Sequence, residues 1–238
     1  MYEEVVSRDL RGVNMQLLAS NRALRLCSQM NYETEVLDII DRTPTGEVFC
    51  DLGACEGRFS VYAALKGLKV ISIEPELRNF SALEKNCALN GLEPEQLTRL
   101  NLAVGNRNGE CQLDVGQPWE GGHQKMVSSI ASRNDLEFEV VESQTVKMVR
   151  LDDIWAEEAL PVPYSLKVDI DGSERIFLEG ATKTLRDVHL QHLMIELQVA
   201  DNTFESIFAE IESHGFSYQD RWQIPNEPGL FNYLFSQD

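Results

Sequence analysis

Acidic residues and glycines that suit a nucleoside ligand stand at the ends of two apolar runs. The run 47–52 reaches Asp51 and breaks at Gly53, and Gly57 follows before an amphipathic stretch. A strand, a tight turn and a helix in this order are where open α/β sheets place ligands. Glu74 ends the next apolar run, where a carboxylate accepts hydrogen bonds from both hydroxyls of a ribose. The spacing therefore predicts a nucleoside site.

The turn itself discriminates between cofactors. Ala54, Cys55 and Glu56 separate Gly53 from Gly57, so the middle glycine of the G-x-G-x-x-G dinucleotide fingerprint is missing. A carboxylate at Asp51 would repel a pyrophosphate but suits a ligand that carries an ammonium group and a positive centre. The pattern therefore favours S-adenosylmethionine over a nicotinamide dinucleotide.

A second group of chemically useful residues lies on the run 164–171. Strand alternation places Lys167, Asp169 and Asp171 on one side, at the carboxyl end that faces the predicted crevice. A carboxylate there can act as general base for a methyl acceptor, and alignment of the reactants supplies further acceleration. The alternative is that Lys167 and Asp169 form an ion pair with a purely structural role.

Metal assistance is a rival to a purely acid–base mechanism. Asp152, Asp153, Asp169 and Asp171 offer the hard oxygen ligands that magnesium prefers, but their spacing fixes no octahedral site. The four histidines show no ligand spacing, and only His123 falls in a segment that we expect near substrate. We therefore predict no metal, with magnesium as the less favoured alternative. Glu196, an acid at another strand end, is a further candidate for the acceptor site.

The five cysteines predict neither a zinc site nor a disulfide framework, because they are scattered and form no C-x-x-C pair. Cys50 and Cys87 fit core packing. Cys55 lies in the glycine turn, where a nucleophilic thiol is an alternative that would need a nearby base.

The net charge and the distribution of apolar residues limit the classes of partner that we expect for this chain. The 238 residues carry a net charge of −18, which opposes binding to a phosphate backbone, so we expect no nucleic-acid partner. The sequence shows no run long enough to span a bilayer and no signal-like start, so we expect a cytoplasmic protein without a membrane partner.

Strand and helix patterns alternate over residues 47–104 and return after residue 145, which predicts a parallel α/β sheet. Residues 1–43 are predicted as a helical extension, because Val13, Leu17, Leu24 and Cys27 share one helical face. The glycine- and serine-rich stretch 116–135 is predicted as a mobile loop, with a lid or a segment without a role as the alternatives. Residues 216–222 and 230–235 are predicted to form an antiparallel pair whose edge suits a homodimer.

The segment DLGACEG at 51–57 resembles the first motif of class I methyltransferases. Further segments resemble the FkbM family in particular: LAVGNRNG at 102–109, VRLDDI at 149–154, LKVDIDGSE at 166–174 and MIEL at 194–197. The resemblance covers about residues 45–235 and implies a Rossmann-like fold: a mostly parallel seven-stranded sheet, an antiparallel C-terminal strand pair and N-terminal helices. It divides the chain into the extension 1–43 and a single methyltransferase domain, 44–238.

The resemblance also implies an activity, namely methyl transfer from S-adenosylmethionine to a hydroxyl of a sugar, glycan or secondary metabolite. A nicotinamide oxidoreductase and a non-catalytic cofactor-binding relative are the alternatives. Two residues depart from the family pattern: Cys55 replaces a usual asparagine, and Asp171 a usual glutamate. The implied cofactor-binding residues are Asp51, Gly53, Ala54, Gly57, Glu74, Pro75, Leu102 and Ala103; the predicted catalytic residues are Asp169 and Lys167; the predicted acceptor-site residues are Asp171, Glu196 and His123.

Overall fold

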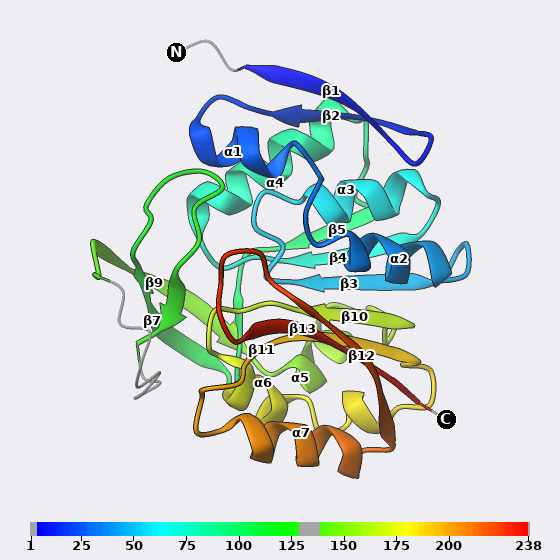
Figure 1. Ribbon diagram of the computed structural model, residues 1–238, viewed down its shortest axis with the longest axis vertical. Helices are drawn as coiled ribbons and strands as arrows, with labels where there is room; N and C mark the ends of the chain where they lie inside the picture. The colour runs from blue at the N-terminus through cyan, green and yellow to red at the C-terminus, as the bar shows by residue number, and fades with distance from the viewer. Residues whose placement is uncertain (1–3, 129–138, 238) are drawn as a thin grey trace.

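A central β-sheet organises the computed structural model, which describes residues 4–128 and 139–237 (Figure 1). In these residues seven strands form the main sheet, in the order β12-β13-β11-β10-β3-β4-β5. The strands β3, β4, β5, β10 and β11 are mutually parallel, whereas β13 runs antiparallel to both β11 and β12. The predicted α/β architecture and the antiparallel C-terminal pair are therefore confirmed.

The strands of the main sheet match the apolar runs of the sequence. Every residue of β3 and of β10 is buried, as expected for strands that are covered on both faces. The bounds are β3 Val48–Leu52, β4 Lys69–Ile73, β5 Leu97–Leu100, β10 Ser165–Val168, β11 His192–Gln198, β12 Phe216–Gln223 and β13 Leu230–Gln237.

Helices cover both faces of this sheet. On one face lie α2 (Thr34–Arg42), α3 (Arg58–Leu65) and α4 (Leu77–Leu89); on the other lie α5 (Leu151–Glu157), α6 (Glu174–Gly180) and α7 (Phe204–Ser213) (Figure 1). Two large apolar clusters reflect this division. Phe49 and Val70 pack with α2 and α3, while Cys50 and Ile71 pack with α5, α6 and α7.

A smaller sheet stands beside the carboxyl ends of the main strands (Figure 1). Within the described residues it has the order β6-β9-β7-β8, formed by β6 Ala103–Val104, β7 Gly109–Val115, β8 Lys125–Val127 and β9 Glu142–Val149. Residues 97–104 are thus divided between the two sheets, with β5 in the main sheet and β6 in the smaller one. The strand β9 ends at Val149, and Leu151 begins α5.

The helical prediction for residues 1–43 is wrong at its start. Residues 5–18 form an antiparallel hairpin of β1 (Val5–Leu10) and β2 (Val13–Leu18), followed by α1 (Arg22–Cys27) and α2. Arg11 and Gly12 both have positive φ at the turn, the backbone of a tight two-residue hairpin. Met15 and Leu17 are buried in the cluster that contains Phe49 and Tyr62, so the hairpin shares a core with the main sheet.

The predicted loop 116–135 is ordered in its described part. Residues 117–124 follow β7 and lead into β8, whereas residues 129–135 lie outside the described residues. Among the described helices none has the length and apolar character needed to cross a bilayer.

Candidate functional site: two cavities that share an acidic junction

A cavity opens at the carboxyl ends of β3, β4 and β10, where the sequence places its glycine turn. Six of the eight predicted cofactor-binding residues line it: Gly53, Ala54, Glu74, Pro75, Leu102 and Ala103. Lys167, Asp169, Asp171 and His123 line it as well. Asp51 and Gly57 are not among the residues that line it.

Glycine is required at both positions of the turn. A Cβ on Gly53 would stand 1.7 Å from the carbonyl oxygen of Asp169, and a Cβ on Gly57 would stand 2.2 Å from a methyl group of Leu83. Both residues also have positive φ, which L side chains rarely adopt. The turn therefore lets β3 approach the end of β10 closely and brings Asp169 to the cavity.

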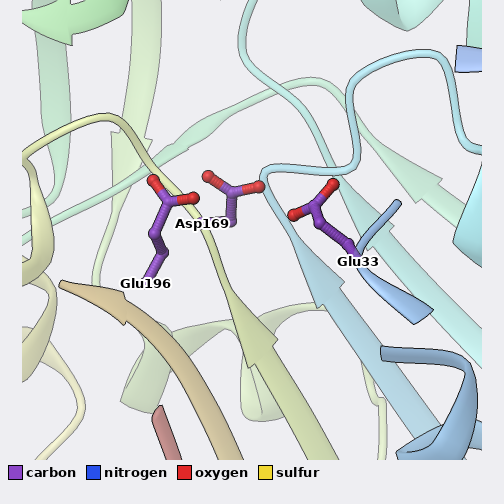
Figure 2. A group of neighbouring side chains, drawn as sticks. All are labelled: Glu33, Asp169 and Glu196. Carbon is purple, nitrogen blue, oxygen red and sulfur yellow. The ribbon is translucent and has the colours of Figure 1, made fainter. Parts of the chain in front are cut away.

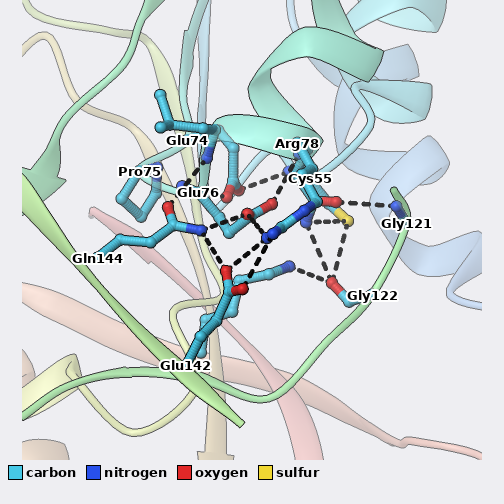
Figure 3. A network of polar contacts seen from close by, with 12 residues as sticks. Cys55, Glu74, Pro75, Glu76, Arg78, Gly121, Gly122, Glu142 and Gln144 are labelled. Atoms are coloured by element: carbon cyan, nitrogen blue, oxygen red, sulfur yellow. Dashed lines mark hydrogen bonds and ion pairs between the residues drawn. The ribbon is translucent and has the colours of Figure 1, made fainter. Parts of the chain in front are cut away.

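Glu74 is held at the cavity wall by two backbone amides. The N–H of Cys55 donates to Oε2 and the N–H of Glu76 donates to Oε1, each at 2.9 Å (Figure 3). Burial raises the pKa of Glu74 to about 7, although the nearby ammonium of Lys125 acts in the opposite direction. The carboxylate is thus fixed where the sequence predicts a ribose ligand.

Residues 117–125, called here the covering segment, form a wall shared by both cavities. Asn79 on α4 fastens this segment: its Oδ1 accepts from the N–H of Gly121 at 2.8 Å, and its Nδ2 donates to the carbonyl of Gly122 at 3.1 Å. Figure 3 shows Gly121 and Gly122 passing over Cys55. Lys125 at the end of the segment is buried and donates to the same Gly122 carbonyl.

Cys55 is placed for packing and not for nucleophilic chemistry. Burial raises the pKa of its thiol well above the ordinary value, and Glu56 adds to the rise. Its Sγ accepts from Asn79 Nδ2 at 3.1 Å. The thiol therefore stays protonated and inert.

A buried polar chain lies beneath the glycine turn. Asp51 accepts from Ser60 Oγ at 2.6 Å, and Lys167 Nζ lies 3.4 Å from Asp51 Oδ1 and 3.2 Å from Asp169 Oδ2. Lys167 therefore bridges the two carboxylates. Asp51 is fully buried and does not line the cavity; its carboxylate contacts Ser60 and Lys167.

Neighbouring charges determine the ionisation states of Lys167 and Asp169. Burial alone opposes charge on Asp169, but Lys167 and, more weakly, His123 hold the pKa of this carboxyl below its ordinary value. Burial lowers the pKa of Lys167, but Asp169 and Asp51 outweigh it and leave that pKa raised. The pair is thus an ammonium and a carboxylate.

A second, larger cavity of about 1030 Å³ adjoins the first. Asp169, Asp171 and His123 line both, so they mark the junction. Glu196 lines the larger cavity together with Glu33, which precedes α2. Every predicted catalytic or acceptor-site residue therefore lies at one cavity or the other.

Three carboxylates meet at the junction. Oxygens of Glu33, Asp169 and Glu196 lie within 4.8 Å of one another, and Figure 2 shows the three side chains converging from separate elements. Burial, reinforced by Asp169, raises the pKa of Glu33 to about 8 and that of Glu196 well above its ordinary value. The guanidinium of Arg58 stacks on the ring of Tyr32 and forms an ion pair with Glu33.

Glu33, Arg58 and Asn79 lie at the site although no sequence pattern described above predicts them. Glu33 stands in the left-handed region at the start of α2, and its distance in sequence from Asp169 hides their proximity. Asp152 and Asp153, considered above as metal ligands, serve elsewhere. Asp152 accepts from the backbone N–H groups of Lys183 and Thr184, and Asp153 accepts from Asn108.

Comparison with known proteins places this geometry in context. The family model described as the methyltransferase FkbM domain matches residues 51–218. A tRNA (guanine(37)-N(1))-methyltransferase of Encephalitozoon cuniculi is 32% identical over 83 residues. That match covers 35% of this chain and 22% of the relative, so the chain spans about a fifth of that protein.

Solved structures share the fold at low identity. Trm5b from Pyrococcus abyssi aligns with a TM-score of 0.53 and 14% identity, over 98% of this chain and 55% of that one. The tRNA m1G37 methyltransferase of M. jannaschii gives 0.52 and 12%, over 100% and 58%. Precorrin-6y C5,15-methyltransferase from Geobacter metallireducens gives 0.51 and 9%, over 98% and 94%. These likenesses concern the fold of class I methyltransferases.

Proposed function

The chain belongs to the FkbM methyltransferase family, and from this premise we propose that it O-methylates a hydroxyl of a sugar, glycan or secondary metabolite. The S-adenosylmethionine-dependent class follows from the family. The acceptor class is the part that we propose. One observation supports it: Asp169 lines both the smaller and the larger cavity, so a carboxylate stands where a donor in one and an acceptor in the other would meet.

The residues of the smaller cavity fit S-adenosylmethionine. Glu74 presents a fixed carboxylate to ribose hydroxyls, and Leu102 and Ala103 offer apolar contact for a purine ring. Glu56, which also lines the cavity, has a buried Oε1 without a hydrogen-bond partner among the described residues, and an ammonium group would satisfy it. When bound, S-adenosylmethionine supplies an electrophilic methyl group on a positively charged sulfur.

Asp169 would act as general base. Its ionised carboxylate would take the proton of the acceptor hydroxyl during methyl transfer, for which S-adenosylmethionine would supply the methyl group. Lys167 holds Asp169 in place at 3.2 Å and keeps it ionised. Asp51 in turn holds Lys167, so the polar chain beneath the turn orients the base.

A small or glycan acceptor agrees with the charge of the protein better than a nucleic acid does. The net charge is −18, and Glu33, Asp169, Asp171 and Glu196 all line the larger cavity. Phosphates would be repelled there, since nucleic-acid affinity rests on lysine and arginine contacts. Because two of the similar proteins are tRNA methyltransferases, the test must also offer tRNA as an acceptor.

The test is transfer of a labelled methyl group to fractionated acceptors. We expect label in a small-molecule or glycan fraction and none in tRNA. Asp169→Asn should lower turnover by about 10²- to 10⁴-fold, the usual contribution of a general base, while S-adenosylhomocysteine still binds. Glu212→Gln, an exposed change on α7 that lies outside both cavities, should leave turnover unaltered.

Three results would count against the proposal. Label in tRNA alone would replace the acceptor class. Full activity of the Asp169→Asn protein would remove Asp169 as the base. In calorimetry, binding of NAD without binding of S-adenosylhomocysteine would favour the oxidoreductase alternative.

A further inference from the structure

Glu196 is a buried carboxylate that lacks a partner. Its side chain belongs to β11, its exposed fraction is 8%, and it accepts no hydrogen bond and forms no ion pair with any described residue. It points into the cavity junction towards Asp169 (Figure 2). An ionised carboxylate in such a place is costly unless a positively charged ligand compensates it.

We propose that Glu33, Asp169 and Glu196 bind one divalent cation of the oxygen-preferring class, such as Mg²⁺ or Mn²⁺, at the junction of the two cavities. Their oxygens, all within 4.8 Å of one another, are close enough to share a single ion. Carboxylate oxygens are the ligands that these cations select. The set differs from the one weighed in the sequence analysis, since only Asp169 is common to both.

Lys167 and Arg58 are the cationic side chains that contact this group of carboxylates. Lys167 contacts Asp169 through Oδ2 alone, and Arg58 contacts Glu33 through Oε2 alone. Asp169 Oδ1 accepts no hydrogen bond from the described residues, whereas Glu33 also interacts with the side-chain amide of Asn232. Lys167 is also shared with Asp51, so the two cations face four carboxylates in all.

The position suits an acceptor hydroxyl as well. The junction opens to the larger cavity, which can supply water or acceptor oxygens for the remaining coordination positions. Magnesium usually keeps several water molecules among its ligands, and an acceptor hydroxyl could replace one of them. A hydroxyl oxygen bound there would lie beside Asp169, and its pKa would fall. This role rests on the proposed function, whereas binding of the ion does not.

The test is a titration of the protein with MnCl₂ in the presence of S-adenosylhomocysteine and without acceptor, followed by electron paramagnetic resonance and repeated with MgCl₂ in calorimetry. We expect one tight site per chain. Loss of an outer-shell partner already costs 10–100-fold in metal affinity, so Glu196→Gln, which removes a ligand charge and keeps the shape, should weaken binding by at least about tenfold.

Glu227→Gln is the matched control, because it removes an exposed carboxylate at the same cavity, and it should leave the affinity unchanged. Circular dichroism verifies that each variant is folded, and Glu33→Gln repeats the test on a second ligand. Absence of a tight site in the wild-type protein, or the same affinity in wild type and both ligand variants, would overturn the proposal. Because no acceptor is present, a failed search for O-methylation would not alter this result.

Discussion

The left-handed backbone of Cys55 (φ 51°) is the point where a single residue of the glycine turn departs from the family pattern. Left-handed backbone costs roughly 1–2 kcal/mol for most L residues, whereas asparagine tolerates it better because its short polar side chain can hydrogen-bond locally. We expect Cys55→Asn to be more stable than Cys55→Ala by about 1 kcal/mol, measured by urea unfolding of the two variants. The Sγ contact with Asn79 is lost in both variants and cancels in the comparison. Equal stability would mean that asparagine relieves no backbone strain at this position.

Residues near one another in sequence were the ones that sequence analysis could place. Lys167 and Asp169 share one strand end, and Glu74 lies one strand from the glycine turn, so strand alternation and the α/β pattern locate them. Glu33 could not be found in this way. Its approach to Asp169 depends on how α2 packs against the sheet, and no local pattern encodes that contact.

The ionisation of Glu74 predicts how cofactor affinity depends on pH. Its pKa is about 7, raised by burial and by Glu76 and lowered by Lys125 and by backbone hydrogen bonds. Only the carboxylate accepts hydrogen bonds from both ribose hydroxyls. We therefore expect affinity for S-adenosylhomocysteine to rise with pH up to about 7 and then level off. At pH 6 the protonated form dominates about ten to one, so affinity should be up to tenfold weaker than at pH 8.

Calorimetry at pH 6 and pH 8 measures this change. Glu74→Gln is the control: it should bind more weakly at both pH values, without the difference between them. A variant that kept the full pH dependence would assign the titration to another group.

At the scale of elements, the covering segment depends on a single side chain of α4. Asn79 is fully buried and makes hydrogen bonds to Gly121, Gly122 and Cys55. Asn79→Ala would leave the buried N–H of Gly121 without its partner, which costs about 1–3 kcal/mol. Because the segment walls both cavities, we expect S-adenosylhomocysteine to dissociate at least about fivefold faster, measured by stopped-flow fluorescence.

Asn90→Ala is the matched control for this prediction. Asn90 caps the same helix but bonds to Gln16 on β2, away from the covering segment. It should lower stability without changing the dissociation rate. If both variants released the ligand equally fast, the effect would belong to α4 as a whole.

The elements themselves were predicted unevenly, for a physical reason. Strands of the main sheet are continuous apolar runs between turn signals, and such runs are readable in a sequence. The hairpin 5–18 was mistaken for helix because Val13 and Leu17 fit a helical face, although they also alternate along β2. Arg11-Gly12 was the available signal, since both residues take the positive φ of a two-residue turn.

Across the whole molecule, negative charge is gathered at the surface and also at the site. Acidic residues outnumber basic ones by 39 to 21, and several acids are buried. The folded state raises the pKa of Glu33 to about 8 and of Glu74 to about 7, and it raises that of Glu196 as well. Burial is the main cause in each case. A change in pH should therefore alter both the stability of the fold and the ionisation of the site.

This response gives a prediction for stability between pH 6.5 and 8.5. The three acids titrate near 4.5 in the unfolded chain, so over this window the folded state binds more protons, and stability falls as pH rises. The lowered pKa values of His192 and His214 act below the window. We expect the free energy of unfolding, from urea titrations with chelator present, to drop by on the order of 2–4 kcal/mol. Glu33→Gln should flatten the slope, because it removes one titrating group. Stability that stayed constant or rose with pH would show that these carboxylates are solvated.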